Sequence, residues 1–264
     1  MHFAEINANT MHYAKVGSPA AHTVVFINSL GTDFRIWRDV AADLLGDYQI
    51  ILYDKRGHGL SGAPEGPYSI DDHIDDLVGL ADHLELERMV LCGVSVGGMI
   101  AQGAAARMPE RIQALVLCDT AHVIGPKEMW DTRIATIQQG GLDAIGDSVM
   151  ERWFSPEFHQ FNPQQLAGYR NMFSRTPLAG YLGTSWAIRD ADFTESSKQI
   201  TLPALCVCGE DDGATPPDLV RSLAELIPGA EFELIASAGH LPSVEQPEVL
   251  TKLIRRFLRQ HNIN

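Results

Sequence analysis

The sequence predicts an α/β fold, with a mostly parallel central sheet, helices on both of its faces and a helical cap inserted over one edge. Short apolar runs rich in β-branched residues alternate with amphipathic helical patterns, which is typical of parallel strands joined by crossover helices. This alternation stops over residues 122–190, where strand-like runs are absent. With 45% apolar and 20% charged residues among 264, the composition is that of a globular protein.

The strands and helices of the core follow from these patterns. Continuous apolar runs predict buried strands at residues 23–28, 49–54, 89–92, 114–118, 204–208 and 231–235. An antiparallel pair at residues 3–7 and 11–16 is expected to precede them. Apolar residues at helical spacing predict core helices at residues 70–84, 96–107, 217–227 and 247–260.

The inserted segment has a different pattern. Residues 127–139 and 142–154 are amphipathic, and Pro156, Pro163 and Pro177 divide the rest into short pieces. We therefore expect a core from residues 1–121, a helical cap from residues 122–190 and a second core part from residues 191–264. Because open α/β sheets bind ligands at the carboxyl ends of their strands, the cap is expected to cover that edge.

Charge and cysteine usage exclude several classes of function. Lys and Arg number 20 against 34 Asp and Glu, a net charge of −14, and no basic cluster suits nucleic acid or an anionic membrane. No apolar run approaches the roughly 20 residues of a membrane span, and no secretory signal is visible, so we expect a cytoplasmic protein. The four cysteines lie in strand-like runs and are expected to be buried, reduced and free of metal: Cys92, Cys118, Cys206 and Cys208.

The strongest chemical signal is Gly93-Val94-Ser95-Val96-Gly97, which joins a predicted strand to a predicted helix. A sharp turn of this kind projects the serine hydroxyl from the sheet, and only glycine fits beside so tight a turn. Ser95 is therefore the predicted nucleophile.

A serine nucleophile needs a general base, and ten histidines are available. His240 follows the last predicted strand, which places its imidazole at the carboxyl edge of the sheet. His73 and His83 share one helical pattern and are expected to line its polar face. His58 lies in a glycine-rich turn with a structural role, and His122 opens the cap as a candidate substrate contact.

A carboxylate on a strand-end loop should orient His240, and the residues alone leave four candidates. Three follow one strand and the fourth ends an earlier one: Glu210, Asp211, Asp212 and Asp119. The oxyanion needs backbone N–H donors. Val96, at the helix start directly after the nucleophile, supplies one, and Leu30, in the loop after an earlier strand, is the expected second.

Together these segments resemble the α/β-hydrolase superfamily over nearly the whole chain. The shared marks are the loop from Asn28, Asp54-x-Arg56-Gly57-x-Gly59-x-Ser61, the turn at Ser95, Gly209-x-x-Asp212 and Gly239-His240. The resemblance implies an α/β-hydrolase fold and favours Asp212 as the acid. The resulting order, Ser95, Asp212, His240, is that of this superfamily.

Finer features are similar to one family. Many members carry His-Gly where this chain has Asn28-Ser29, and Asn-Ser-Leu-Gly resembles the bacterial 3-oxoadipate enol-lactonases, as do residues 187–193, 212–217 and 239–247. The resemblance implies hydrolysis of 3-oxoadipate enol-lactone to 3-oxoadipate in the β-ketoadipate pathway of aromatic degradation. It also implies that neither a metal nor an organic cofactor is needed.

The carboxylate of such a substrate needs a cation within an acidic protein. The cap offers Lys127, Arg133, Arg152, Arg170, Arg175 and Arg189. Arg133 is preferred because it lies three residues after Trp130, so that a guanidinium and an aromatic wall share one helical face. Trp153 is expected to shape the apolar part of the pocket.

Several readings compete with a lactonase. Haloalkane dehalogenases and epoxide hydrolases use an aspartate nucleophile, so Ser95 argues against both. Carboxylesterases, carbon–carbon bond hydrolases and cofactor-free perhydrolases all keep a serine and stay open. A hydrolase-like receptor that binds a ligand without turnover is the alternative from a different class.

Overall fold

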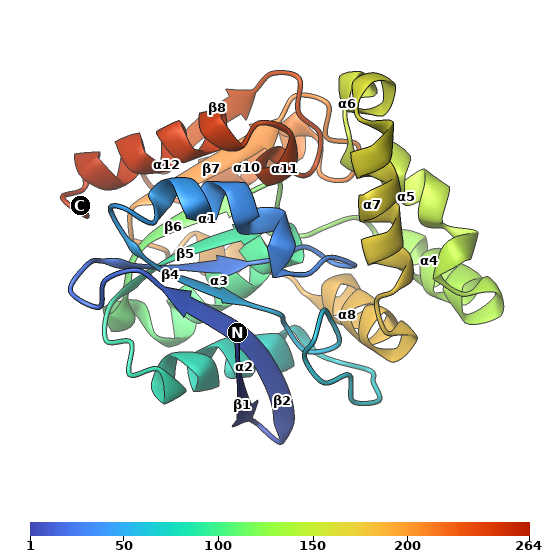
Figure 1. Ribbon diagram of the computed structural model, residues 1–264, viewed down its shortest axis with the longest axis horizontal. Coiled ribbons are helices and arrows are strands. Elements are labelled where there is room, and N and C mark those ends of the chain that lie inside the picture. The colour runs from blue at the N-terminus through green and yellow to red at the C-terminus, as the bar shows by residue number, and fades with distance from the viewer.

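A computed structural model describes all of residues 1–264 and contains one eight-stranded sheet, in the order β1-β2-β4-β3-β5-β6-β7-β8 (Figure 1). The strands are β1 (His2–Ile6), β2 (Asn9–Val16), β3 (Thr23–Ile27), β4 (Gln49–Tyr53), β5 (Met89–Val94), β6 (Ile112–Cys118), β7 (Ala204–Gly209) and β8 (Glu231–Ile235). From β4 to β8 every pairing is parallel, whereas β1 and β2 are antiparallel. The predicted fold class is confirmed.

Helices cover both faces of the sheet. The predicted helices appear as α2 (Ile70–His83), α3 (Val96–Arg107), α10 (Pro217–Leu226) and α12 (Pro247–Gln260). Other short helices of the core are α1 (Arg38–Leu44), α9 (Thr194–Ser197) and α11 (Pro242–Glu245), with 3₁₀ turns at Phe34–Trp37 and Pro109–Arg111. A third 3₁₀ turn, Leu142–Ala144, lies within residues 122–190. Helices α1 and α12 pack together on one face, and α2 and α3 on the other (Figure 1). None of the helices is both long and apolar enough to cross a membrane.

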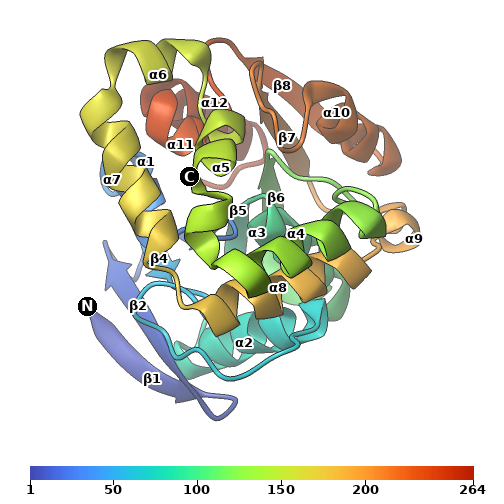
Figure 2. The ribbon, with the colours of Figure 1, turned by 90° about the vertical axis from the view of Figure 1, so that its right-hand side faces the viewer.

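Between β6 and β7, five helices come before α9: α4 (Lys127–Gly140), α5 (Gly146–Trp153), α6 (Pro156–Phe161), α7 (Pro163–Ser174) and α8 (Leu178–Asp190). Figure 2 shows α4, α5, α7 and α8 in front of the sheet, with α4 lying along α8. Pro156 and Pro163 each occupy the first turn of a helix, where the N–H that proline lacks would have no partner. These two prolines thus begin α6 and α7.

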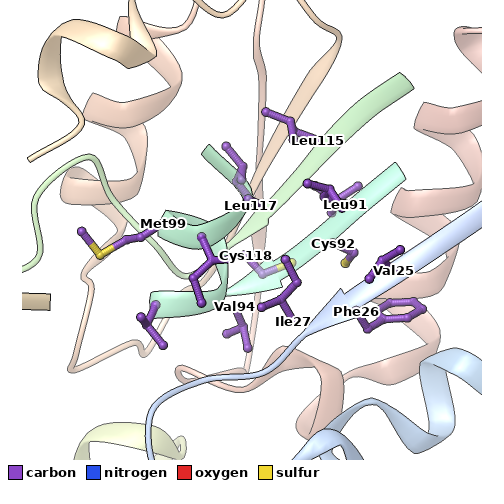
Figure 3. Packing of buried hydrophobic residues seen from close by; sticks show 14 of the residues in the cluster. Val25, Phe26, Ile27, Leu91, Cys92, Val94, Met99, Leu115, Leu117 and Cys118 are labelled. Atoms are coloured by element: carbon purple, nitrogen blue, oxygen red, sulfur yellow. The ribbon is translucent and has the colours of Figure 1, made fainter. Parts of the chain in front are cut away.

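The core of the molecule lies around β3, β5 and β6. Figure 3 shows Val25, Phe26 and Leu91 among the side chains that fill it, and each is at most 1% exposed. All four cysteines are buried, as predicted, and none is paired with another in a disulfide.

One expectation about α2 is wrong. His73 does not line a polar face, because it is buried at 1% exposure, with the ring of Tyr68 against it at 5.8 Å between centroids. Neither ring nitrogen of His73 has a hydrogen-bond partner. His83, at the end of the same helix, is exposed as expected.

Candidate active site

The turn between β5 and α3 holds Ser95 in a conformation that its neighbours impose. Ser95 has a positive φ of 59° with ψ of −124°. A Cβ added to Gly93 would lie 2.3 Å from the carbonyl oxygen of Gly97, and one added to Gly97 would lie 2.3 Å from that of Ile27. Both glycines are therefore required by close approaches of backbone. Ser95 is 7% exposed and lines a cavity under the inserted helices.

The loops after β7 and β8 bring an imidazole and a carboxylate together. Nδ1 of His240 donates to Oδ2 of Asp212 at 2.9 Å, and both residues are buried. Asp212 also accepts from the backbone N–H groups of Ala214 and Thr215 and from the Thr215 hydroxyl, at 2.7, 3.0 and 2.6 Å. These donors fix the carboxylate. Because Nδ1 carries the proton in this arrangement, Nε2 of His240 is free to accept one.

Asp119, the other carboxylate considered, lies beside this pair and has different partners. Its Oδ1 accepts from the backbone N–H of Gly209 at 2.8 Å, and its Oδ2 is buried without a partner. Burial, together with the nearby charge of Asp212, raises the pKa of Asp119 well above its ordinary value. Asp119 therefore has its own partner, and the carboxylate that accepts the hydrogen bond from His240 is Asp212.

The last residues of α5 are hydrogen-bonded to both of these loops. The N–H of His240 donates to the carbonyl of Trp153 at 2.8 Å. The N–H of Gly213 donates to the carbonyl of Arg152 at 3.2 Å, and Nε of Arg152 donates back to the carbonyl of Gly213 at 2.9 Å. The end of α5 therefore fixes the positions of the loops that carry the imidazole and the carboxylate.

The cavity brings together most of the residues that the sequence indicates. Its volume is about 40 Å³, and Ser95, His240, Leu30, Trp130, Arg133 and Trp153 line it. His122 is not among the lining residues: its carbonyl accepts from the N–H of Phe193, where the inserted helices return to the core, and burial lowers the pKa of its ring. A larger groove of about 550 Å³ between α7 and residues 32–35 contains neither Ser95 nor His240.

Two guanidinium groups face this cavity, and neither is paired with a carboxylate. Arg133 lies over the rings of Trp130 and Tyr181, with Cζ 5.4 and 5.7 Å from their centroids, and donates to the Tyr181 hydroxyl. Its Nε is buried without a partner. Burial and the charge of Arg133 lower the pKa of Arg152. Unpaired cations this close together favour an anionic ligand.

Of the cap cations that the sequence offers, Arg133 is preferred, but Arg152 lines the cavity as well. Its position depends on the contact with Gly213, 61 residues later, and no local pattern encodes such a contact. The shared helical face of Trp130 and Arg133, in contrast, follows from their spacing and is confirmed by the cation–π contact. The other cations of the cap are exposed or engaged at the surface, as Arg189 is with Asp131.

Two backbone N–H groups are candidates to receive an oxyanion. Leu30 lines the cavity, and its N–H donates to no protein group. Val96 is the first residue of α3, where helical N–H groups lack an intrahelical acceptor. The N–H of Gly31, by contrast, is engaged, because it donates to Nε2 of His58 at 3.0 Å.

Comparisons with known proteins identify the family. Residues 22–138 match the family described as the alpha/beta hydrolase fold. A 3-oxoadipate enol-lactonase of Acinetobacter baylyi is 31% identical over 252 residues, covering 96% of this chain and 94% of that protein. The enol-lactonase of Burkholderia xenovorans LB400 has a crystal structure that matches with a TM-score of 0.94 at 36% identity, covering 98% of this chain and 100% of that one. A putative carbamate hydrolase, RutD of Pantoea ananatis, is 27% identical over 266 residues, covering 95% and 94%. The chain belongs to the α/β-hydrolase family, and 3-oxoadipate enol-lactonases are among its relatives.

Proposed function

We propose that this protein hydrolyses 3-oxoadipate enol-lactone to 3-oxoadipate through an acyl-enzyme on Ser95. The observation that carries the proposal is the pair of unpaired guanidiniums, Arg133 and Arg152, in the cavity that Ser95 and His240 line. A serine hydrolase site with two free cations suits a small ester that bears its own carboxylate. The identity to the two enol-lactonases supports the same substrate.

The chemistry uses each group in turn. Ser95 Oγ attacks the lactone carbonyl while Nε2 of His240 takes its proton, and Asp212 stabilises the imidazolium. The N–H groups of Leu30 and Val96 receive the oxyanion. When the carbonyl carbon loses its bond to the ring oxygen, the leaving enolate stays tethered to the acyl-enzyme.

A tethered leaving group could close the ring again. We propose that the proton held by His240 passes to the enolate and that tautomerisation to the ketone makes ring opening irreversible. His240 then activates a water molecule, which attacks the acyl carbon and releases Ser95. These reaction steps conserve protons and need no oxidant or reductant.

Arg133 is proposed to bind the substrate carboxylate with help from Arg152, while Trp130 and Trp153 form the apolar walls. A cavity of about 40 Å³ has room for about one water molecule. The side chains of the cap therefore have to move apart to admit a lactone.

The decisive experiment follows the ultraviolet absorbance of enzymatically generated enol-lactone. Wild type should consume it, and Ser95→Ala should lose activity by a factor on the order of 10⁶. Retention of wild-type activity in Ser95→Ala would falsify the acyl-enzyme. Neutral p-nitrophenyl esters and a carbamate, assayed in parallel, identify a general esterase or a carbamate hydrolase if either exceeds the lactone in kcat/KM.

A receptor without turnover makes a different prediction. A fluorophosphonate reacts quickly only with an activated serine. Labelling of wild type but not of Ser95→Ala is expected, whereas an unlabelled wild type would support a binding function.

A further inference from the structure

We propose that Lys55 is a positioning residue of the oxyanion hole, and that its ammonium polarises the peptide group whose N–H receives the oxyanion. This inference rests on the proposed function and deepens it. Lys55 lies in the loop after β4, outside the cavity, and is 1% exposed. Its Nζ donates to the carbonyl oxygen of Ser29 at 2.6 Å.

The position of this hydrogen bond within the peptide group gives it a role in catalysis. The carbonyl of Ser29 and the N–H of Leu30 belong to the same peptide unit. A donor at the carbonyl oxygen withdraws electron density from the amide, so the N–H becomes a stronger donor on the other side. A charged donor has a larger effect than a neutral one. Lys55 therefore strengthens the Leu30 donor without contacting substrate.

His58 binds the next peptide group of this loop, but through the N–H of that group rather than its carbonyl. Its Nδ1 donates to the carbonyl of Arg56 at 3.0 Å, which leaves Nε2 to accept from the N–H of Gly31. Burial and the charge of Lys55 lower the pKa of His58, which keeps the ring neutral and Nε2 an acceptor. With Gly31 engaged, the N–H of Leu30 stays free of a protein acceptor.

A purely structural role does not require a charge at this place. The hydroxyl of Thr32 already donates to the same Ser29 carbonyl at 2.9 Å, so the oxygen would be satisfied without Lys55. A buried ammonium costs free energy, and burial does lower the pKa of Lys55 well below its ordinary value, although the charges of Asp54 and Asp33 oppose this. The chain nevertheless places this buried amine, with two carboxylates that favour its charged form, directly behind the candidate donor.

The experiment compares Lys55→Met with Thr32→Val, and uses Lys252→Met as the matched control, because Lys252 is an exposed lysine on α12. The substrate is a neutral p-nitrophenyl ester, so the result does not depend on lactone specificity. For Lys55→Met we expect kcat to fall about 10-fold, part of the 100- to 1000-fold cost of losing a whole donor, with KM nearly unchanged. Thr32→Val should lose less, and Lys252→Met nothing.

A spectroscopic readout separates polarisation from packing. The infrared carbonyl stretch of an acyl-enzyme trapped on Ser95 reports how strongly the oxyanion hole holds that oxygen. The stretch should move to higher wavenumber in Lys55→Met, in proportion to the loss of kcat. If Lys55→Met fails to fold, Lys55→Gln, which keeps a neutral donor, should give a smaller shift in the same direction.

An unchanged stretch, or a rise in KM with kcat preserved, would overturn the role of Lys55. The outcome for the proposed function stays distinct. A wild type that is acylated by the ester but does not hydrolyse the enol-lactone disproves only the substrate, whereas a wild type that is never acylated at Ser95 overturns both proposals.

Discussion

Arg133 and Arg152 are both cations of the cavity, but their contacts differ. Arg133 donates to Tyr181 and has a free Nε, whereas Arg152 also binds the carbonyl of Gly213 beside Asp212. We expect Arg133→Gln to raise KM for the anionic lactone about 10- to 100-fold, the cost of a hydrogen bond to a charged group. KM for a neutral ester should change little. Steady-state kinetics on both substrates measure the difference.

Arg152→Gln is expected to lower kcat for both substrates, because it also loosens the loop that carries Asp212. Arg175→Gln serves as the control, since Arg175 is an exposed cap arginine outside the cavity. Equal changes in KM for the lactone and the neutral ester in Arg133→Gln would contradict its proposed role.

Single residues of the site can be predicted from the sequence where the backbone itself imposes the pattern. The glycines around Ser95 are required by approaches of 2.3 Å, so they are visible as a motif. Lys55 was not predicted, because its partner lies 26 residues earlier and the contact exists only after β3 and β4 pair. The place of His122 at the start of the cap predicts a contact with substrate, yet His122 does not line the cavity.

Helix α8 contacts the core through the backbone of a glycine, Gly180. A Cβ added to Gly180 would lie 2.0 Å from the carbonyl oxygen of Gly57, so this helix cannot approach the core loop with a larger residue. We expect Gly180→Ala to lower the free energy of unfolding by about 1–3 kcal/mol, the usual cost of overpacking. Activity should fall as well, because α8 also carries Tyr181 and Ile188 of the cavity. Urea unfolding and kcat/KM are the measurements.

Gly168 in α7 provides the matched control for Gly180. No atom lies within 4 Å of a Cβ added there. Gly168→Ala should therefore raise the free energy of unfolding by about 0.5–1 kcal/mol through helix propensity alone. If the two alanine variants changed stability in the same direction, α8 would not depend on this close approach.

Elements were predicted well where a local pattern or motif marks them and less well elsewhere. Helices α2, α10 and α12 have apolar residues at helical spacing and were found within a few residues of their bounds. Most of α8 is buried, so its sequence shows no polar face and its bounds could not be read. Helix α1, with seven residues, is too short for a periodic pattern.

The whole molecule combines a net charge of −14 with an unpaired cationic pair in its cavity. An acidic surface gives no general attraction to an anionic substrate. The proposed function therefore assigns recognition of the anionic substrate to the local charge of Arg133 and Arg152 within the cavity. An acidic exterior is thus combined with a cationic interior that is proposed to bind a carboxylate.

Acid should destabilise the fold through buried histidines. Burial lowers the pKa of His58 and His73 well below 6.5, which is the value expected for the unfolded chain. Below pH 6.5 the unfolded chain therefore binds protons that the folded chain does not, and stability falls as pH decreases. The raised pKa values of Asp119 and Glu245 act in the opposite direction, because their contribution is lost as pH rises through the carboxylate range.

His73→Phe isolates one of these histidines. The phenyl ring keeps the edge contact with Tyr68 and removes two unpartnered buried nitrogens, so the variant should be more stable at every pH. Its advantage over wild type should grow below pH 6.5, approaching about 1.4 kcal/mol per pH unit, the value for one proton. Urea unfolding of both proteins between pH 5 and 8 measures this difference, and the carboxyl contributions cancel in it. Curves that stay parallel below pH 6.5 would show that His73 takes up a proton in the folded state and that its burial does not set the acid limit of this fold.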